Sequence, residues 1–271
     1  MRMEKTRLIA IDLDGTLLDR ESRIPERNGK AVADAMKRGI GVTLCTGRMF
    51  RSTRAFAEAL SIELPLVCYN GAMIRDPKGS TRMHAPLSAS VAKRALAMFR
   101  ERGVYVQSYI DDVLYIRDAD DAEFRNYTTR YGVPGTAVGD ALFDPPSPPT
   151  KLLAVAANVE RARIVADEIA GALGADAYVT RSNSEFVEVM NPSVNKANGL
   201  SSLAREMGVR MDEVMAIGDG ENDTEMISSA GIGIAMSNGC LKAKTAARDI
   251  APANYENGVA WAIEKYALLR G

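Results

Sequence analysis

Short apolar segments alternate along this chain with longer segments whose apolar side chains recur at helical spacing. Residues 8–11 and 41–45 are compact apolar runs, which predict buried strands. Between them, Ala31 and Ala35 are one helical turn apart and predict a helix over residues 25–38. This order of strand, helix and strand is typical of βαβ units in a parallel sheet.

The same rhythm stops after Asn70 and returns from Lys196 onward. The residues in between contain strands of their own, together with helices predicted over 88–102, 122–131 and 160–173. A length of 271 residues suits about two domains. We therefore predict a Rossmann-like, doubly wound α/β core formed by residues 1–83 and 191–271, with a second α/β domain, residues 84–190, inserted into it.

The charge balance narrows the classes of partner. The chain has 34 Lys and Arg residues against 35 Asp and Glu residues, a formal net charge of −1. No overall positive field draws it to nucleic acid, and no apolar run approaches the roughly 20 residues that span a bilayer. We expect a cytoplasmic protein without nucleic-acid or membrane partners, present as a monomer or a homodimer.

Cysteine and histidine are scarce in this chain. Its three cysteines, Cys45, Cys68 and Cys240, are too far apart for a CxxC site, and their number does not indicate a disulfide framework. His84 is the only histidine, which excludes a two-histidine mechanism. Acid–base chemistry would therefore use carboxylates, lysine or tyrosine.

Two aspartates follow the first apolar run. Asp12 and Asp14 stand at the end of the predicted strand, and Gly15 after them allows a tight turn. Carboxylates that are buried together repel each other unless a cation holds them, and Mg²⁺ prefers such oxygen ligands. The alternative is an ordinary Asp-Gly turn in which one aspartate faces water.

A second acidic segment, Gly218–Asp223, follows a later apolar run. It offers Asp219, Asn222 and Asp223 at a strand end before a helix. A calcium loop of the EF-hand type would need a glutamate at position twelve, and counting from Asp219 that position is Ala230. An acidic loop that merely faces water remains an alternative.

Three further positions carry weaker signals. Thr46, Gly47 and Arg48 follow the second strand, where a hydroxyl and backbone N–H groups could bind phosphate. Taken alone, Thr46 would be a helix N-cap beside a solvated Arg48. Lys196 alone would be a surface lysine, and Asn70 followed by glycine alone would be a turn.

Together these motifs resemble the haloacid dehalogenase superfamily, and within it the Cof-type phosphatases with a type IIB cap. The resemblance spans nearly the whole chain, and the inserted α/β domain corresponds to that cap in position and size. One departure is Ala197, because many relatives have glycine directly after the lysine. The motifs that carry the resemblance are Asp12-Leu-Asp-Gly-Thr16, Thr46-Gly-Arg48, Asn70-Gly-Ala72, Lys196 and Gly218-Asp-Gly-Glu-Asn-Asp223.

The resemblance implies a Mg²⁺-dependent phosphatase that works through an aspartyl-phosphate. Asp12 would be the nucleophile, and Asp14 would protonate the leaving oxygen and then activate water. Mg²⁺ would bind the Asp12 carboxylate, the Asp14 backbone carbonyl and Asp219. Asp223 would orient metal-bound water or Lys196.

The resemblance also implies which groups bind the phosphate. The N–H of Leu13, Thr46 with the N–H of Gly47, Lys196 and Asn222 would match its negative charge. The substrates would be small phosphorylated metabolites, either sugar phosphates or cofactor- and nucleotide-type monoesters. The alternatives are a phosphotransferase or phosphomutase on the same scaffold, and a regulator whose phosphorylated Asp12 turns over slowly.

The substrate's leaving group would be selected elsewhere. Candidates in the inserted domain are Lys151, Arg181 and Ser182, which lie near predicted strand ends. In the core, Arg48 and Asn70 are further candidates. Any of the candidates in the inserted domain could instead be a solvated surface residue.

Overall fold

The first apolar run of the chain forms an interior strand of a parallel sheet. In the computed structural model, which describes residues 6–269, this strand is β1 (Leu8–Ile11), and all of its side chains are buried. It pairs with β2 (Gly41–Leu44) on one side and with β12 (Val214–Gly218) on the other. β13 (Ile232–Met236) and β14 (Asp249–Ala251) extend the sheet beyond β12. The expected doubly wound α/β core is therefore confirmed.

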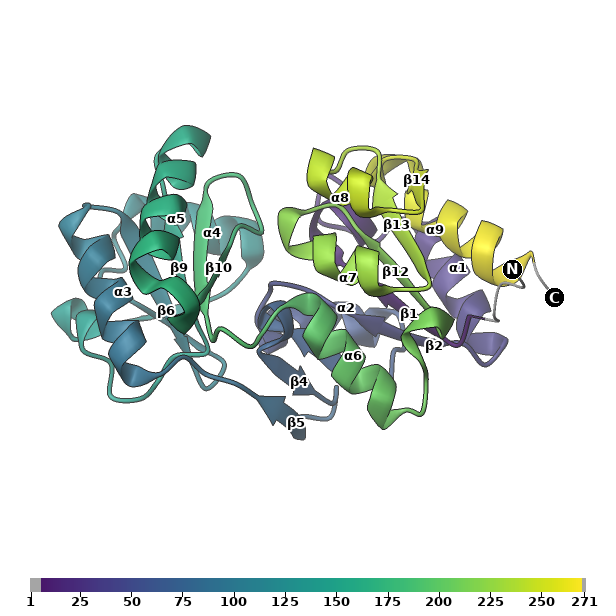
Figure 1. Ribbon diagram of the computed structural model, residues 1–271, viewed down its shortest axis with the longest axis horizontal. Helices are drawn as coiled ribbons and strands as arrows, with labels where there is room; N and C mark the ends of the chain where they lie inside the picture. Colours follow the sequence, from purple (N-terminus) through teal and green to yellow (C-terminus); the bar gives the residue numbers. More distant parts are fainter. Residues whose placement is uncertain (1–5, 270–271) are drawn as a thin grey trace. The chain divides into compact units, whose positions relative to one another are not determined.

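Helices cover both faces of this sheet, because its side chains alternate between the faces. Leu8 and Ala10 pack with residues of α6 (Lys196–Glu206) and α7 (Thr224–Ser229). On the opposite face, α1 (Glu26–Lys37) and α9 (Gly258–Ile263) pack against each other (Figure 1). The remaining helices of this part of the chain are α2 (Phe50–Ala59) and α8 (Leu241–Ala246).

A small antiparallel sheet extends the core where the rhythm changes. It contains β3 (Leu66–Cys68), β4 (Met73–Arg75) and β5 (Thr81–His84), in that order. A parallel bridge from Cys45 to Val67 joins β3 to the end of β2. β4 and β5 form a hairpin, in which the Asp76 N–H donates to the Ser80 carbonyl at 2.9 Å.

The inserted residues form a sheet of their own with helices on it. The strand order is β10-β11-β9-β6-β7-β8, and all pairs are antiparallel except β7 with β8. The strands are β6 (Tyr105–Ile110), β7 (Val113–Ile116), β8 (Gly135–Ala137), β9 (Lys151–Val155), β10 (Tyr178–Thr180) and β11 (Phe186–Met190). The helices are α3 (Ala89–Glu101), α4 (Ala122–Tyr131) and α5 (Val159–Leu173).

The two faces of this second sheet differ in polarity. One face is apolar and packs against α3 and α5, which lie side by side in Figure 1. The other face carries a buried polar network in which Gln107 donates to the Tyr109 hydroxyl at 2.7 Å and Tyr109 donates to Tyr127 of α4 at 2.7 Å. Lys151 lies beside Tyr109 on the same face.

The described chain divides into two units. Unit 1 is Met1–Met83 with Asn195–Gly271, and unit 2 is His84–Val194. The second boundary lies at 194/195 rather than at 190/191, because the Asn191 side chain donates to the Pro86 carbonyl at 2.9 Å and so ties this segment to unit 2. None of the described helices is long and apolar enough to cross a membrane.

A close approach between α6 and the loop after β3 gives the first testable prediction. A Cβ on Gly199 of α6 would lie 2.7 Å from Val67 Cγ1 and 2.8 Å from Gly71 Cα. We expect Gly199→Ala to lower the free energy of unfolding by about 2 kcal/mol, because neither neighbour can move freely in this packed core.

The matched control is Gly29→Ala in α1, where the added Cβ meets its nearest atoms at an ordinary 3.8 Å. This variant should gain up to about 1 kcal/mol from improved helix propensity. Urea unfolding followed by Trp261 fluorescence measures both changes, since all three residues lie in unit 1. Equal effects of the two substitutions would contradict the packing argument.

Candidate active site

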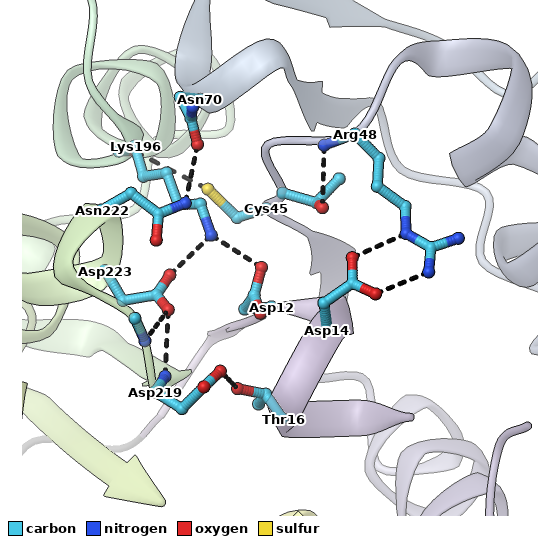
Figure 2. A network of polar contacts seen from close by, with 12 residues as sticks. Asp12, Asp14, Thr16, Cys45, Arg48, Asn70, Lys196, Asp219, Asn222 and Asp223 are labelled. Carbon is cyan, nitrogen blue, oxygen red and sulfur yellow. Dashed lines mark hydrogen bonds and ion pairs between the residues drawn. The ribbon is translucent and has the colours of Figure 1, made fainter. Parts of the chain in front are cut away.

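Polar residues that follow several core strands meet at the carboxyl edge of the sheet. Asp12 follows β1, and its N–H donates to the Ile217 carbonyl of β12 at 3.0 Å. Thr46 follows β2, and the Asn70 N–H after β3 donates to the Thr46 carbonyl at 2.9 Å. Figure 2 shows the side chains of Asp12 and Asn70 in one region. The strand order therefore brings together motifs that lie far apart in the sequence, as expected for a parallel sheet.

Lys196 lies at the centre of this region. Its Nζ is 2.6 Å from Asp12 Oδ1 and 2.6 Å from Asp223 Oδ1, and its side chain is fully buried (Figure 2). Burial disfavours the ammonium ion, but the two carboxylates outweigh it and hold the Lys196 pKa well above its usual value. The lysine is therefore a fixed positive charge and not the surface residue of the alternative interpretation.

Negative charge exceeds positive charge around this lysine. Asp12, Asp219 and Asp223 each offer an oxygen, and these oxygens lie within 4.8 Å of one another. Burial raises the pKa of Asp12 well above its usual value, opposed by Lys196 and reinforced by Asp223 and Asp219. Burial, and then the Asp223 charge, raise the pKa of Asp219 to about 7. The one positive charge of Lys196 is therefore too little to stabilise the ionised forms of all these carboxylates.

Asp223 has hydrogen-bond partners at both of its oxygens. Oδ2 accepts from the N–H groups of Asp219 at 2.9 Å and Gly220 at 2.8 Å, and Oδ1 accepts from Lys196. Gly218 leaves the space for this carboxylate, since a Cβ there would lie 2.5 Å from Asp223 Cγ. Asp223 therefore shapes the loop and orients Lys196, and it is buried, which rules out a merely solvated acidic loop.

Thr16 holds Asp219 in place, a contact that sequence reasoning missed. Its hydroxyl donates to Asp219 Oδ1 at 2.8 Å. Gly15 makes the approach possible, because its φ is +79° and a Cβ there would lie 2.4 Å from Asp219 Oδ2. The only signal in the sequence was the threonine that ends the Asp12–Thr16 motif.

Asp14 is held by Arg48 on the same edge. The guanidinium donates from Nε to Oδ2 at 2.7 Å and from its terminal nitrogen to Oδ1 at 2.6 Å, a bidentate pair. The Arg48 side chain is only 9% exposed, so it is not the solvated arginine of the alternative interpretation. This arrangement fixes the orientation of Asp14 in the protein without substrate.

Thr46 is not a helix cap. The helix α2 begins at Phe50, and the Thr46 hydroxyl accepts a bond from the Arg48 N–H at 3.2 Å inside the preceding loop. Thr46 and Gly47 are both buried at the strand end. Their hydroxyl and backbone groups therefore belong to the loop beside Asp12 and not to the helix.

Asn70 and Asn222 form a buried amide pair. The Asn222 Nδ2 donates to Asn70 Oδ1 at 2.8 Å, and both side chains are buried. Asn70 has a left-handed φ of +53°, which asparagine tolerates better than most residues. Asn70 thus positions the amide of Asn222, a more specific role than the turn that Asn70-Gly71 alone would indicate.

The remaining candidates lie in unit 2. Lys151 is buried, and its Nζ is 2.7 Å from Glu188 Oε1 and 4.9 Å from the centre of the Tyr109 ring. It is therefore not a solvated surface lysine. Arg181 and Ser182 are half-buried in the segment between β10 and β11.

Comparison with known proteins places the chain in a family. Residues 9–263 match the family described as haloacid dehalogenase-like hydrolases. The 5-amino-6-(5-phospho-D-ribitylamino)uracil phosphatase YcsE of Bacillus subtilis is 30% identical over 97% of this chain and 96% of its own length. The chloroplastic endoribonuclease YBEY of Arabidopsis thaliana is 28% identical over 96% of this chain, but the chain spans only 46% of that longer protein.

A solved structure agrees with these matches. The haloacid dehalogenase-like hydrolase from Bacteroides thetaiotaomicron superimposes with a TM-score of 0.85 at 29% identity, covering 96% of this chain and 99% of that one. Fold, sequence motifs and relatives thus agree across nearly the whole length. The prediction that this chain is a phosphatase of the haloacid dehalogenase type is confirmed, and the chain belongs to the haloacid dehalogenase-like hydrolases.

Proposed function

We propose that this enzyme hydrolyses small phosphate monoesters with the help of Mg²⁺, through an aspartyl-phosphate on Asp12. One observation carries the proposal. A buried carboxylate, Asp12, lies 2.6 Å from the fixed charge of Lys196 and within reach of Asp219 and Asp223. Such a cluster combines a nucleophile, a cation site and a positive group for phosphate in one place.

The carboxylates fit a magnesium ion. Hard oxygen ligands suit Mg²⁺, and Asp12 and Asp219 carry negative charge that Lys196 does not neutralise. We assign the ion to these two side chains and to the Asp14 backbone carbonyl. Asp223 would orient metal-bound water or Lys196. When bound, the ion supplies positive charge that offsets the carboxylates and the phosphate.

Asp12 and Asp14 divide the covalent chemistry. An Asp12 oxygen attacks phosphorus, the bond from phosphorus to the leaving oxygen breaks, and Asp14 gives that oxygen a proton. Water then attacks the phosphorus of the aspartyl-phosphate while Asp14 takes a proton from it, which releases phosphate and restores Asp12. Before each proton transfer, Asp14 must give up one of the hydrogen bonds that it accepts from Arg48. Arg48 therefore sets the position from which the Asp14 carboxyl group starts.

Five groups surround the place where the phosphate would bind. They are the N–H groups of Leu13 and Gly47, the Thr46 hydroxyl, the Lys196 ammonium and the Asn222 amide. Preorganised donors of this kind stabilise the charge that spreads over the transferring phosphoryl group. Asn70 contributes by orienting Asn222, as their 2.8 Å bond indicates.

Unit 2 would select the leaving group. The relative YcsE is named for a substrate whose phosphate sits on a ribityl chain, which supports phosphorylated sugars or sugar alcohols as the first compounds to test. Arg181 and Ser182 are the proposed contacts to the leaving group. Lys151 would act through its pair with Glu188, because its charge is already matched by that carboxylate.

The experiment measures phosphate release from phosphorylated sugars, sugar alcohols, nucleotides and p-nitrophenyl phosphate. We expect release with Mg²⁺, none with EDTA, and a loss of at least about a thousandfold in Asp12→Asn, because no other group can take the phosphoryl. Asp34→Asn is the matched control, since Asp34 lies on the exposed surface of α1, 2.7 Å from Lys30. It should keep full activity.

Two outcomes would contradict hydrolysis. Phosphate that appears on a second sugar instead of in solution would identify a phosphotransferase. Stable phosphate on Asp12 without turnover would identify a slow phosphorylated regulator.

Magnesium binding should depend on pH through Asp219. Its pKa is about 7 in the folded chain against about 3.9 when unfolded. The folded state therefore keeps the Asp219 proton up to a higher pH than the unfolded state does. The stability that this proton confers is lost as the pH rises from about 4 to about 7. Because Mg²⁺ binds the ionised form, we expect it to raise Tm by several degrees at pH 8 and by clearly less at pH 5.5.

Thermal unfolding with Mg²⁺ and with EDTA at both pH values measures this difference. In Asp219→Asn the increase in Tm should vanish at both. An equal increase at the two pH values would mean that the ion binds elsewhere.

The Thr16 hydroxyl should tune the same site. Thr16→Val removes the donor to Asp219 while keeping the shape of the side chain, so we expect about tenfold weaker activation by Mg²⁺. Thr53→Val is the matched control, because Thr53 is equally buried but donates to the Met49 carbonyl in α2. Titration of activity with Mg²⁺ measures the half-activating concentration, and an unchanged value in Thr16→Val would contradict the role of this residue.

A further inference from the structure

Unit 2 contains a cavity of about 520 Å³ that shares no residue with the catalytic cluster. We propose that this cavity is a second binding site, which holds a small phosphorylated metabolite without hydrolysing it. The volume lies in the range of pockets that bind small molecules. The proposal goes beyond the phosphatase activity and does not depend on it.

Four arginines line the cavity, and they come from three different segments. Arg100 is near the end of α3, Arg102 follows that helix, Arg117 follows β7, and Arg161 is in the first turn of α5. Guanidinium groups are the side chains best suited to bind phosphate oxygens, because they offer paired donors in a planar fork. Their convergence from separate elements gives a ligand several directions of contact.

The carboxylates of the cavity do not balance these charges. Asp121 and Glu123 are the two acidic residues that line it. Asp121 caps α4, and its Oδ1 accepts from the N–H groups of Glu123 at 2.8 Å and Phe124 at 3.4 Å. Glu168, outside the lining, pairs with Arg102 at 2.6 Å, so the capacity for an anionic ligand lies with Arg161 and with the pair of Arg100 and Arg117.

A carboxylate outside the lining bridges two of the arginines. Asp140 accepts from Arg100 at 3.2 Å through Oδ2 and lies 2.9 Å from Arg117 through Oδ1. The Asp140 side chain is 57% exposed, and ion pairs this exposed add little stability. One anion already spans this pair of guanidinium groups, and a phosphate can take its place at small cost.

Arg161 has more capacity for a ligand. Among the described residues it forms no ion pair, and the one bond that it donates, to the Arg102 carbonyl, is long at 3.5 Å. It is half-buried, so part of its hydration is already lost. A partly desolvated guanidinium without a carboxylate gains more from an incoming anion than a fully solvated one.

The rest of the wall is apolar and aromatic. Val104, Val106 and Leu142 contribute aliphatic surface, and Tyr105 and Phe143 contribute rings. The Arg100 guanidinium lies 4.7 Å from the centre of the Phe143 ring. This lining suits a phosphate that is attached to a flat or apolar group and not a bare inorganic ion.

The cavity lacks the means to break a phosphate ester. Its two carboxylates have no buried lysine beside them, and no serine, threonine, cysteine or histidine lines it. It lies at the end of the sheet marked by Tyr105 of β6 and Val155 of β9. The chain enters unit 2 at the other end, where the Leu87 N–H donates to the Pro149 carbonyl just before β9.

The experiment uses the full chain in EDTA, so that the carboxylates of the catalytic cluster repel anions. AMP and glucose 6-phosphate are titrated by calorimetry, with adenosine as the uncharged control. We expect AMP to bind more tightly than glucose 6-phosphate because of the aromatic wall, and adenosine not to bind. Raising NaCl from about 50 to about 500 mM should weaken binding strongly.

Arg161→Gln is the test variant, and Arg163→Gln is the matched control on the same helix. Arg163 pairs with Glu160 and Asp167 and does not line the cavity. Arg161→Gln should weaken AMP binding about tenfold or more, and Arg163→Gln should leave it unchanged. Because Arg161 is not part of the catalytic cluster, kcat and KM for p-nitrophenyl phosphate should be the same in both variants.

Three results would overturn the proposal. The first is that neither phosphorylated compound binds at millimolar concentration. The second is that both variants weaken binding equally, which would indicate a nonspecific charge effect. The third is that Arg161→Gln raises KM for hydrolysed substrates, which would make the cavity part of the substrate site. Failure of the phosphatase proposal would instead appear as absent turnover with AMP binding intact.

Discussion

The charge of Lys196, buried between Asp12 and Asp223, is the interaction on which the rest of the site depends. Removing a lysine from water costs several kcal/mol unless carboxylates accompany it, and here two do, each at 2.6 Å. Breaking either contact would leave a buried charge unmatched. The same pair of contacts links the end of β1 to the start of α6 and to the loop after β12, so the arrangement that stabilises the lysine also sets the positions of Asp12 and of that loop.

This arrangement also explains how the core tolerates a large insertion. Asp12 comes from the first segment of the core, and Lys196 and Asp223 come from the segment after unit 2. The parallel pairing of β1 with β12 and the close contact of Gly71 with Gly199 join the two segments. The insertion ends at Val194, only two residues before Lys196, and unit 2 has a hydrophobic core and a polar network of its own.

Most of the core could be predicted from the sequence, because each buried strand there is a continuous apolar run that ends in a polar motif. The helices α1, α3, α4 and α5 followed from their periodicity and their terminal glycine or serine residues. Short elements such as β8, β14 and α8 were missed, since three to six residues carry too little pattern. Contacts between distant segments were missed for another reason. The bonds of Thr16 to Asp219 and of Arg48 to Asp14 depend on tertiary structure, which spacing along the chain does not encode.

Two buried lysines of this protein differ in the number of carboxylates that surround them. Lys151 lies 2.7 Å from Glu188, so one carboxylate within unit 2 matches its charge. The nearby hydrogen bonds that Gln107 makes with Tyr105 and Tyr109 join uncharged groups. Lys196 contacts two carboxylates, Asp12 and Asp223, and Asp219 is the third member of their cluster. Among the described residues only these three acidic groups lie close enough to share a metal ion. In the proposed function, a bound Mg²⁺ would offset this excess of negative charge. A matched buried pair leaves no net charge to attract a ligand, whereas a buried cluster with excess carboxylates attracts a cation.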